Sequence, residues 1–327
     1  MSTLHKSFLS EVERALDTPK KIERLLSYMN SEAKYQPFVR SIKKLYERLP
    51  SSSAAYSEVF LELAEKTIGR ETYQTIADGY IAFVMDVNRS QVHYELSGQY
   101  ANSSYEEVFQ STYDNEEFMK HYHWGVFAST FLWEHHIKIT EFFNHTFLPL
   151  LSEEKNLRCF DLGAGSGIWS WQLVKHYQEA KVDAVDISKT SVKKLDEMMA
   201  HNDMQNRVTA NLGDATSWPS SKQILEYDCG ISCFLLEHLE QPLKLFENIA
   251  RLLKPRGVAF VTAALTAAEI DHIYEFKRES EIILMAEQAG LRVIETKSLG
   301  PSNYPKDGTF FPRSMALIVS KRGGKIW

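Results

Sequence analysis

The sequence contains little cysteine and no long apolar run, and both absences narrow what the chain can be. Its three cysteines, Cys159, Cys229 and Cys233, are odd in number and stand in or beside apolar segments, which favours buried thiols over a disulfide framework. No stretch approaches the roughly 18 consecutive apolar residues of a membrane span. Residues 1–6 lead directly into charged helical sequence without a secretory leader. We therefore expect a cytoplasmic protein without a membrane segment.

Clustered positive charge is also missing. The 327-residue chain carries 37 lysines and arginines against 43 acidic residues, a formal net charge of −6, and its basic residues are scattered. Proteins that bind nucleic acid neutralise phosphates with a basic surface, so nucleic acid is not an expected partner. The hydrophobic content of 44% is ordinary for a globular protein with a sizeable core. The sequence leaves the oligomeric state open.

The chain divides into two halves of different character. In the first half apolar residues recur at helical intervals, as in Ile22, Leu25 and Met29, which predicts amphipathic helices. The second half alternates apolar strands with helical segments, the signature of a doubly wound α/β sheet. We therefore predict an all-α domain over residues 1–150 and an α/β domain over residues 151–327.

The strands of the second half are short apolar runs separated by helices or turns. The link over residues 300–313 is too short for a crossover helix, so the last strand should pair antiparallel with the strand before it. Helices are predicted over residues 168–177, from about residue 190, and over residues 243–253 and 279–289. The predicted strands cover residues 158–162, 181–186, 208–212, 227–233, 258–265, 291–299 and 314–320.

The most informative stretch is residues 160–167, where an apolar strand runs into glycines spaced G-x-G-x-G and then into a helix. Glycine tolerates positive φ angles and lets backbone N–H groups at a helix N-terminus approach a ligand closely. This arrangement indicates a nucleotide-type site. The dinucleotide fingerprint G-x-G-x-x-G would need glycine at position 168, which is Ile168, so hydride transfer is disfavoured.

Two carboxylates follow predicted strands at what should be one edge of the sheet. Asp186 ends the second strand, 23 positions after Gly163, and Asp214 follows the third. Ligands of open α/β sheets bind at this carboxyl edge, where an acidic side chain accepts hydrogen bonds from ribose hydroxyls. An alternative role for Asp186 is to cap the helix that starts near Thr190.

Five motifs of the second half occur in the order and approximate spacing of one known family. They are Asp161–Gly167, Asp186, Gly213–Ala215, Leu236–Leu239 and Leu253–Gly257. Over about half its length the chain resembles the class I S-adenosylmethionine (SAM) dependent methyltransferases. The resemblance implies a seven-stranded sheet with the last strand antiparallel, and SAM lying across the strand ends. It also implies an enzyme that methylates a small molecule of natural-product or metabolite type at oxygen or nitrogen.

Carried over by position, the resemblance implies a set of cofactor-binding residues. The glycine loop would face the methionine part of SAM, Asp186 the ribose and Asp214 the adenine. The Asn/Asp-Pro-Pro-Tyr motif of base and amide N-methyltransferases is replaced by residues 232–235, Ser-Cys-Phe-Leu, which disfavours a nucleobase or glutamine-amide acceptor. The implied set is Asp161, Gly163, Ala164, Gly165, Gly167, Asp186, Ile187, Asp214, Ala215, Ser232, Cys233 and Phe234.

Residues 113–147 are rich in aromatic side chains and contain five histidines. One interpretation is structural, because Phe127, Phe131, His135 and Ile139 would share one face of a single long helix. In the other interpretation the segment forms a lid over the acceptor, and its aromatic faces steady the sulfonium cation of SAM. The lid residues expected to meet the substrate are Tyr105, Tyr113, Tyr122, Trp124, Phe127 and Trp133.

Proton transfer is required only for some acceptors. A carboxylate needs positioning alone, whereas a phenol or an ammonium group must lose a proton. The candidate bases are His123, His135, His136 and His238. The sequence has no HExxH or CxxC spacing, so no metal site is predicted.

Two further hypotheses use the same SAM site. In one, the lid folds the aminocarboxypropyl arm of SAM so that its amine attacks the γ-carbon, which gives methylthioadenosine and azetidine-2-carboxylate. In the other, the chain is a SAM-binding scaffold without catalysis. The full set of donor-site motifs favours an enzyme over the scaffold.

Overall fold

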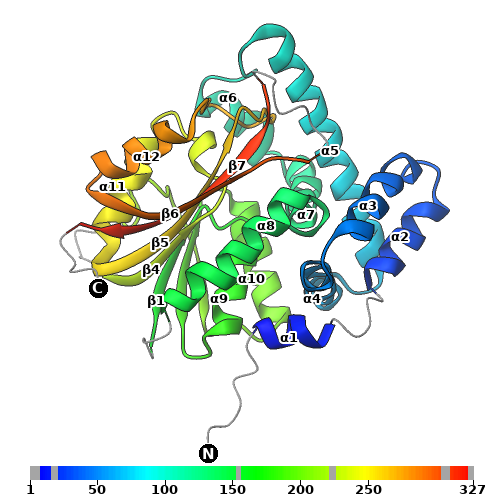
Figure 1. The fold of residues 1–327 in the computed structure, drawn as a ribbon, viewed down its shortest axis with the longest axis horizontal. Helices are drawn as coiled ribbons and strands as arrows, with labels where there is room; N and C mark the ends of the chain where they lie inside the picture. The colour runs from blue at the N-terminus through cyan, green and yellow to red at the C-terminus, as the bar shows by residue number, and fades with distance from the viewer. Residues whose placement is uncertain (1–7, 16–20, 152–155, 221–225, 303–309, 323–327) are drawn as a thin grey trace, which may run out of the picture.

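Helices form the first half of the chain and a mixed sheet forms the second in the computed structural model (Figure 1). The structure describes residues 8–15, 21–151, 156–220, 226–302 and 310–322, so the expectation about the first six residues lies outside these ranges. Within them, none of the helices combines the length and apolar character that a membrane crossing requires.

The amphipathic patterns of the first half fold as helices with their apolar residues buried. Pro50 separates two of them: the first has ended at Arg48, and the second begins at Ser51 directly after the proline, which lacks the N–H that a helix interior needs. The helices are α1 (Phe8–Ala15), α2 (Lys21–Ser31), α3 (Gln36–Arg48), α4 (Ser51–Ile68), α5 (Thr72–Ser97), α6 (Tyr105–Val108), α7 (Glu116–Leu132) and α8 (Glu134–Phe142), with the short turns η1 (Gly69–Glu71), η2 (Phe109–Tyr113), η3 (Phe143–Phe147) and η4 (Leu148–Leu151).

The single long helix expected through Phe127 and Ile139 is wrong, because the chain breaks at Trp133. This residue is extended, with φ −111° and ψ 126°, between the end of α7 and the start of α8. Phe127 and Ile139 are still buried, whereas His135 lines a cavity. Tryptophan is tolerated in helices, so apolar spacing alone does not reveal the break.

The second half forms a seven-stranded sheet of order β3-β2-β1-β4-β5-β7-β6, which confirms the predicted fold class. The last strand, β7, lies between β5 and β6. It is antiparallel to β6, as expected, and also to β5. The strands are β1 (Arg158–Leu162), β2 (Lys181–Asp186), β3 (Val208–Leu212), β4 (Tyr227–Ser232), β5 (Leu253–Leu265), β6 (Leu291–Leu299) and β7 (Arg313–Lys321); the helices are α9 (Ile168–His176), α10 (Lys189–His201), η5 (Leu236–His238), α11 (Pro242–Leu252) and α12 (Glu279–Gln288).

The two faces of the sheet enter different hydrophobic clusters. Cys159 of β1 packs on the face covered by α8, α9 and α10, whereas the next residue, Phe160, packs under α11 and α12 (Figure 1). This alternation follows from the two-residue period of a strand. All three cysteines are free and buried, as predicted.

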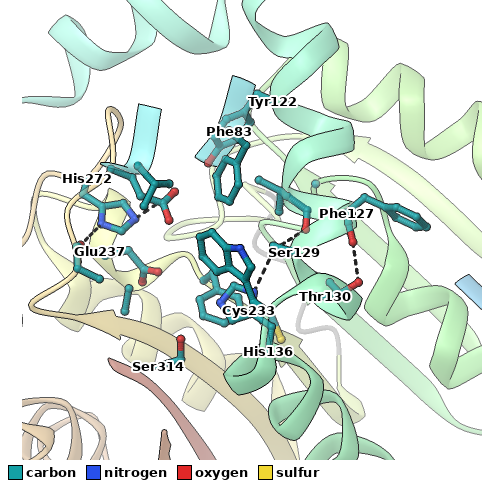
Figure 2. Close-up of a pocket in the computed structure, with 18 of the residues that line it drawn as sticks. Phe83, Tyr122, Phe127, Ser129, Thr130, His136, Cys233, Glu237, His272 and Ser314 are labelled. Atoms are coloured by element: carbon teal, nitrogen blue, oxygen red, sulfur yellow. Dashed lines mark hydrogen bonds and ion pairs between the residues drawn. The ribbon is translucent and has the colours of Figure 1, made fainter. Parts of the chain in front are cut away.

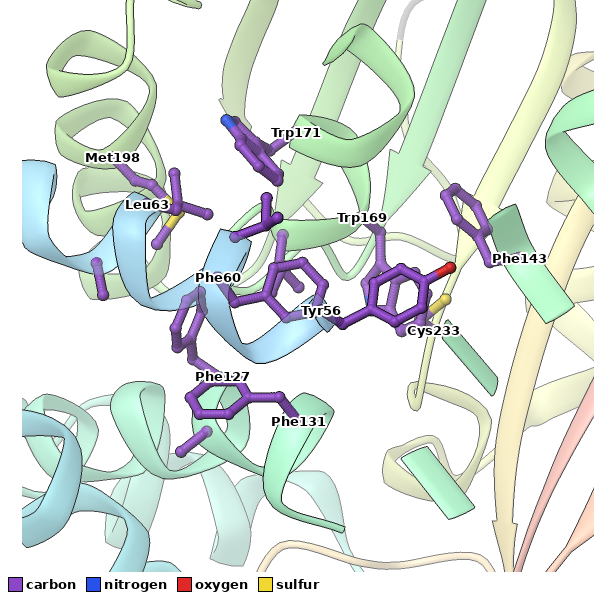
Figure 3. Close-up of a cluster of buried hydrophobic side chains, with 14 of the residues drawn as sticks. Tyr56, Phe60, Leu63, Phe127, Phe131, Phe143, Trp169, Trp171, Met198 and Cys233 are labelled. Atoms are coloured by element: carbon purple, nitrogen blue, oxygen red, sulfur yellow. The ribbon is translucent and has the colours of Figure 1, made fainter. Parts of the chain in front are cut away.

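The helical half shares its core with the sheet (Figure 3). Phe60 of α4 lies 6.3 Å and 6.2 Å, between ring centroids, from Phe127 and Phe131 of α7. On its other side Phe60 meets Trp171 of α9 edge-on at 6.4 Å. Because these rings form one continuous cluster, the helices are held against the sheet. The division into domains at residues 150 and 151 stays a prediction.

Two glycines let α5 and α7 cross closely. A Cβ at Gly125 would lie 2.4 Å from the Cβ of Phe83 and 2.6 Å from the carbonyl oxygen of Gly79. We expect Gly125→Ala to push the helices apart and to lower the free energy of unfolding by about 1–3 kcal/mol, the usual cost of overpacking. Denaturant unfolding measures this loss, and Lys120→Ala on the exposed side of α7 should stay within about 0.5 kcal/mol of wild type. Equal stability of the two variants would contradict the prediction.

Candidate active site

A cavity of about 490 Å³ lies between helices α5, α7 and α8 and the carboxyl ends of the strands (Figure 2). Its volume falls within the roughly 300–1,000 Å³ typical of small-molecule sites. The helices contribute aromatic and histidine side chains, and the sheet contributes the glycine loop and several carboxylates. The cavity therefore joins the two halves of the chain in one site.

The glycine loop has the geometry that its sequence predicts. Gly163, Gly165 and Gly167 have φ angles of +74°, +53° and +78°, and α9 starts directly after Gly167. The N–H groups of Gly163 and Ala164 both donate to the carbonyl of Val185, at 2.8 and 3.0 Å, which ties the loop to β2. A Cβ at Gly165 would meet no protein atom within 4 Å, so glycine here leaves space for a ligand.

Asp186 is held at the end of β2 with its carboxylate at the cavity. One oxygen accepts the N–H of Gly165 and the other accepts the N–H of Ser188, both at 2.9 Å. Burial raises the pKa of Asp186, and the backbone N–H groups oppose that rise. The capping alternative is wrong, because Ser188 is the N-cap of α10 and its side chain accepts the N–H of Ser191.

The other implied cofactor residues separate into two groups. Gly163, Ala164, Gly165, Ile187, Asp214, Ala215, Cys233 and Phe234 line the cavity with Asp186, whereas Asp161, Gly167 and Ser232 are not among its lining residues. Ser232 is fully buried and donates its hydroxyl to the carbonyl of Leu162 at 2.9 Å. It therefore supports the strand ends from below. Asp214 is exposed at the rim and accepts the N–H of Thr216 at 2.8 Å.

Asp161 is a buried carboxyl group beneath the glycine loop, with 1% of its surface exposed. One oxygen accepts the hydroxyl of Ser170 at 2.6 Å, and the other has no hydrogen-bond partner among the described residues. Burial raises the pKa of Asp161 to about 7, against the hydrogen bond from Ser170, and the charge of Asp186 adds to the rise. Near neutral pH the folded protein thus holds this group partly protonated.

This raised pKa predicts how stability depends on pH. In the unfolded chain the carboxyl of Asp161 ionises near pH 4, so between about pH 4 and the folded pKa of about 7 the unfolded state binds fewer protons. The contribution of Asp161 to stability therefore falls as the pH rises through this window. We expect Asp161→Asn to melt a few degrees above wild type at pH 8, and this difference in melting temperature should shrink toward pH 4. A difference in melting temperature that does not change with pH would contradict this account.

Five of the six predicted lid residues line the cavity: Tyr105, Tyr113, Tyr122, Phe127 and Trp133. Trp124 does not, and this prediction is corrected. Its side chain is buried at the crossing of α5 and α7, where it meets Phe127 edge-on with ring centroids 5.3 Å apart. The aromatic composition of the segment could not separate rings that face the cavity from rings that face the helix crossing.

The four candidate histidines all line the cavity. Burial lowers the pKa of His123 and His135 to about 4 and that of His136 well below its ordinary value, so these three imidazoles are neutral at pH 7. Nε2 of His123 lies 3.0 Å from the hydroxyl of Ser191, and Nδ1 of His238 lies 3.0 Å from the hydroxyl of Tyr113.

His136 has a defined tautomer. The hydroxyl of Ser129 donates to the carbonyl of Val126 at 2.7 Å, so its oxygen is left to accept from Nδ1 of His136 at 3.0 Å (Figure 2). Nδ1 therefore carries the proton, and Nε2 keeps a lone pair. The ring packs against Phe234, which follows β4, with centroids 4.7 Å apart. Among the candidate bases, His136 thus contacts the residues implied for the methyl-donor side.

Three residues of the cavity wall, Glu237, Glu269 and His272, and the neighbouring Asp271 are missing from the sequence prediction. Glu237 lies in the motif Leu236–Leu239, for which the sequence suggests no function of the glutamate, and Glu269, Asp271 and His272 follow β5. The available signal was the run Glu-Ile-Asp-His after the carboxyl end of a parallel strand, the same position that drew attention to Asp186.

The glycine loop and Asp186 fit SAM as a ligand. The glycine loop brings the backbone to the cavity directly before α9, Gly165 leaves open space, and Asp186 presents a carboxylate at the end of β2. Such a carboxylate suits a ribose diol, and the aromatic walls suit a sulfonium cation. The cavity continues past Phe234 to the histidines, which leaves space for a second molecule.

Comparisons with known proteins agree with this geometry. Residues 160–257 match the model of a family described as a methyltransferase domain. The chain is 28% identical over 161 residues to the ubiquinone biosynthesis O-methyltransferase of Coxiella burnetii, which covers 43% of this chain and 66% of that protein. It is 26% identical over 161 residues to the biotin biosynthesis bifunctional protein BioHC of Teredinibacter turnerae, and this match covers 44% of this chain and 28% of that protein. The chain thus spans 28% to 66% of the length of these relatives.

One solved structure is similar over most of the chain. The mitomycin 7-O-methyltransferase MmcR superimposes with a TM-score of 0.52 at 13% identity, covering 79% of this chain and 73% of that one. At this identity the likeness concerns the fold. Its coverage extends beyond the sheet into the helical half.

Proposed function

We propose that this chain, whose second half carries a class I SAM-dependent methyltransferase domain, transfers the methyl group of SAM to a small molecule. One observation carries the proposal: a single cavity contains the strand-end residues that fit SAM and, beyond them, a wall of aromatic and histidine side chains. Methyl transfer needs both a donor site and an adjacent acceptor site closed to water. We assign the donor site to the sheet and the acceptor site to residues 1–150.

The donor side is assigned to residues that already have fixed positions. Asp186, anchored by the N–H groups of Gly165 and Ser188, would accept hydrogen bonds from the ribose hydroxyls. Asp214 and the amide of Ala215 would bind adenine, and the glycine loop would bind the methionine part. Asp161 and Ser232 would support this loop from beneath rather than touch the cavity.

The acceptor side is assigned to His136 and the aromatic residues near it. When bound, SAM supplies a methyl group activated by its sulfonium. The lone pair of the acceptor forms the new bond to the methyl carbon, the electrons of the carbon–sulfur bond return to sulfur, and S-adenosylhomocysteine leaves. Nε2 of His136, unprotonated in the tautomer set by Ser129, would take the proton that a hydroxyl or ammonium acceptor must lose.

The acceptor is proposed to be a small molecule methylated at oxygen or nitrogen. The lining contains Phe83, Tyr122 and Trp133, so an aromatic or largely apolar body fits it. The Coxiella relative is named for O-methylation, which supports oxygen as the attacked atom. That name also favours methyl transfer over the intramolecular cyclisation of SAM.

One experiment separates the possibilities. Purified protein is incubated with SAM, with and without a panel of phenols, hydroxy acids and amines, and the products are quantified by mass spectrometry. S-adenosylhomocysteine that forms only when an acceptor is added supports the proposal. Methylthioadenosine formed above the spontaneous background from SAM alone would replace it with cyclisation. Calorimetry that detects no binding of SAM or S-adenosylhomocysteine would refute both.

A further inference from the structure

Beside the proposed acceptor site, the cavity wall holds a compact group of carboxylates and imidazoles that methyl transfer does not use. Glu237 and His238 come from the turn after β4, and Glu269, Asp271 and His272 come from the segment after β5. Figure 2 shows Glu237 and His272 across the cavity from Ser129 and Phe127. All but Asp271 line the cavity.

The potential ligand atoms form two groups of three that share one histidine. One oxygen or nitrogen from each of Glu237, His238 and His272 lies within 4.8 Å of the others, and the same holds for Glu269, Asp271 and His272. His272 belongs to both sets, and the rings of His238 and His272 stand edge to face with centroids 4.8 Å apart. The two groups are thus joined at His272 and by the contact between Nδ1 of His238 and Asp271, 3.4 Å apart.

The carboxylates of this group lack the partners that buried acids normally have. Glu237 is fully buried, and among the described residues neither of its oxygens has a hydrogen-bond partner; one oxygen of the fully buried Asp271 has none there either. Throughout the described residues, no lysine or arginine forms an ion pair with Glu237, Glu269 or Asp271. Buried acids are usually paired or bound to a metal, because an uncompensated charge is costly to bury.

His272 is oriented as a metal ligand. Its Nδ1 lies 2.7 Å from the carbonyl oxygen of Ala267 and must donate to it. Since Nδ1 is engaged by this carbonyl, Nε2 is the ring nitrogen left to bind a cation. Nε2 of His272 lies 3.7 Å from a carboxylate oxygen of Glu269. Metal-bound histidines characteristically donate their other N–H to a carbonyl or carboxylate, and a cation between Nε2 and the carboxylate would bring two electron-rich atoms together favourably.

We propose that Glu237, His238, Glu269, Asp271 and His272 form a binding site for one divalent first-row metal cation. Mixed imidazole and carboxylate ligands suit Mn²⁺, Fe²⁺ or Zn²⁺ better than Mg²⁺, which prefers oxygen ligands. The inference replaces the sequence expectation of no metal site. It rests on the proposed function only in its consequence: a cation here would lie beside the acceptor and favour substrates with an oxygen that can ligate it.

The test measures binding of metal alone to the full chain. Protein stripped with a chelator is titrated with MnCl₂ and, separately, with ZnCl₂ in a calorimeter. We expect saturation at one ion per chain, and at least a tenfold loss of affinity in Glu237→Gln, because even the loss of a partner outside the ligand set typically costs about 10- to 100-fold. Asp271→Asn is the second variant, since its amide oxygen can still accept the hydroxyl of Tyr113. His201→Ala, an exposed histidine on α10, should bind like wild type.

Two results would overturn the site. One is the absence of saturable binding of both metals to wild type. The other is unchanged affinity in folded Glu237→Gln and Asp271→Asn, with thermal melting used to verify folding. Titration of the same preparations with S-adenosylhomocysteine keeps the two proposals apart. If S-adenosylhomocysteine binds but neither metal does, this inference alone is refuted. If a metal binds but S-adenosylhomocysteine does not, the proposed function alone is refuted.

Discussion

His136→Ala is expected to lower kcat for a hydroxyl or ammonium acceptor by roughly 10²–10⁴-fold, the range for loss of a general base. The imidazole lines the cavity beside Phe234, and its Nδ1 proton is engaged by Ser129, so the proposed base is Nε2, which carries no proton. Alanine leaves no group in this position to accept the proton. Single-turnover assays with saturating SAM measure the change, because they isolate the chemical step from product release.

The matched control is His121→Ala on the preceding helix, α7. His121 is absent from the cavity lining and lies near Glu117, 3.7 Å away, so its loss should leave kcat within about twofold of wild type, as for surface substitutions. Both variants should still bind S-adenosylhomocysteine, since neither replaces a residue assigned to hold its ribose, adenine or methionine part. A His136→Ala enzyme with wild-type kcat would remove the base assignment and leave positioning as the whole contribution of the helical half.

The sheet was largely predictable because its signals are local. The strand over Lys181–Asp186 was bounded correctly from six residues of sequence, since apolar runs between polar turns mark buried parallel strands. The G-x-G-x-G spacing likewise fixed the turn before α9, where each glycine takes a positive φ. Asp186 and Asp214 followed from the rule that parallel strands end at one edge. Each of these inferences needs only a few neighbouring residues.

The remaining features depend on contacts between distant segments. In the sheet β7 lies between β5 and β6. The apolar pattern of a strand predicts that the strand exists but not which strands it pairs with. Trp124 and Tyr122 are almost adjacent, yet one packs at a helix crossing and the other lines the cavity. The group around His272 forms only because β4 and β5 are adjacent in the sheet, which brings residues 237 and 272 together.

The capping of α10 shows a third limit. Asp186 and Ser188 both precede the helix, and both residue types are good N-caps. The structure gives that position to Ser188, because the carboxylate of Asp186 already accepts N–H groups from the loop and the turn. Only the fold of the glycine loop, which presents Gly165 to this carboxylate, separates the two possibilities.

Asp186→Ala should weaken the binding of S-adenosylhomocysteine by roughly 10- to 150-fold, which corresponds to about 1.5–3 kcal/mol for lost hydrogen bonds to a charged group. The substitution removes the acceptor proposed for the ribose hydroxyls. It also leaves the N–H groups of Gly165 and Ser188 without their present acceptor, so the loop loses an anchor. Calorimetric titration at constant pH and ionic strength measures the change in affinity.

Two companion variants identify the cause of that loss. Asp183→Asn changes another acid of β2, one that accepts the hydroxyl of Tyr227 at 2.8 Å and is absent from the cavity lining, so its affinity should equal that of wild type. The affinity of Asp186→Asn for S-adenosylhomocysteine should lie between those of wild type and Asp186→Ala. The amide oxygen of asparagine can accept one N–H, while its NH₂ group opposes the other donor. Wild-type affinity in a folded Asp186→Ala protein would show that the ribose is held elsewhere, and would move the donor site away from the end of β2.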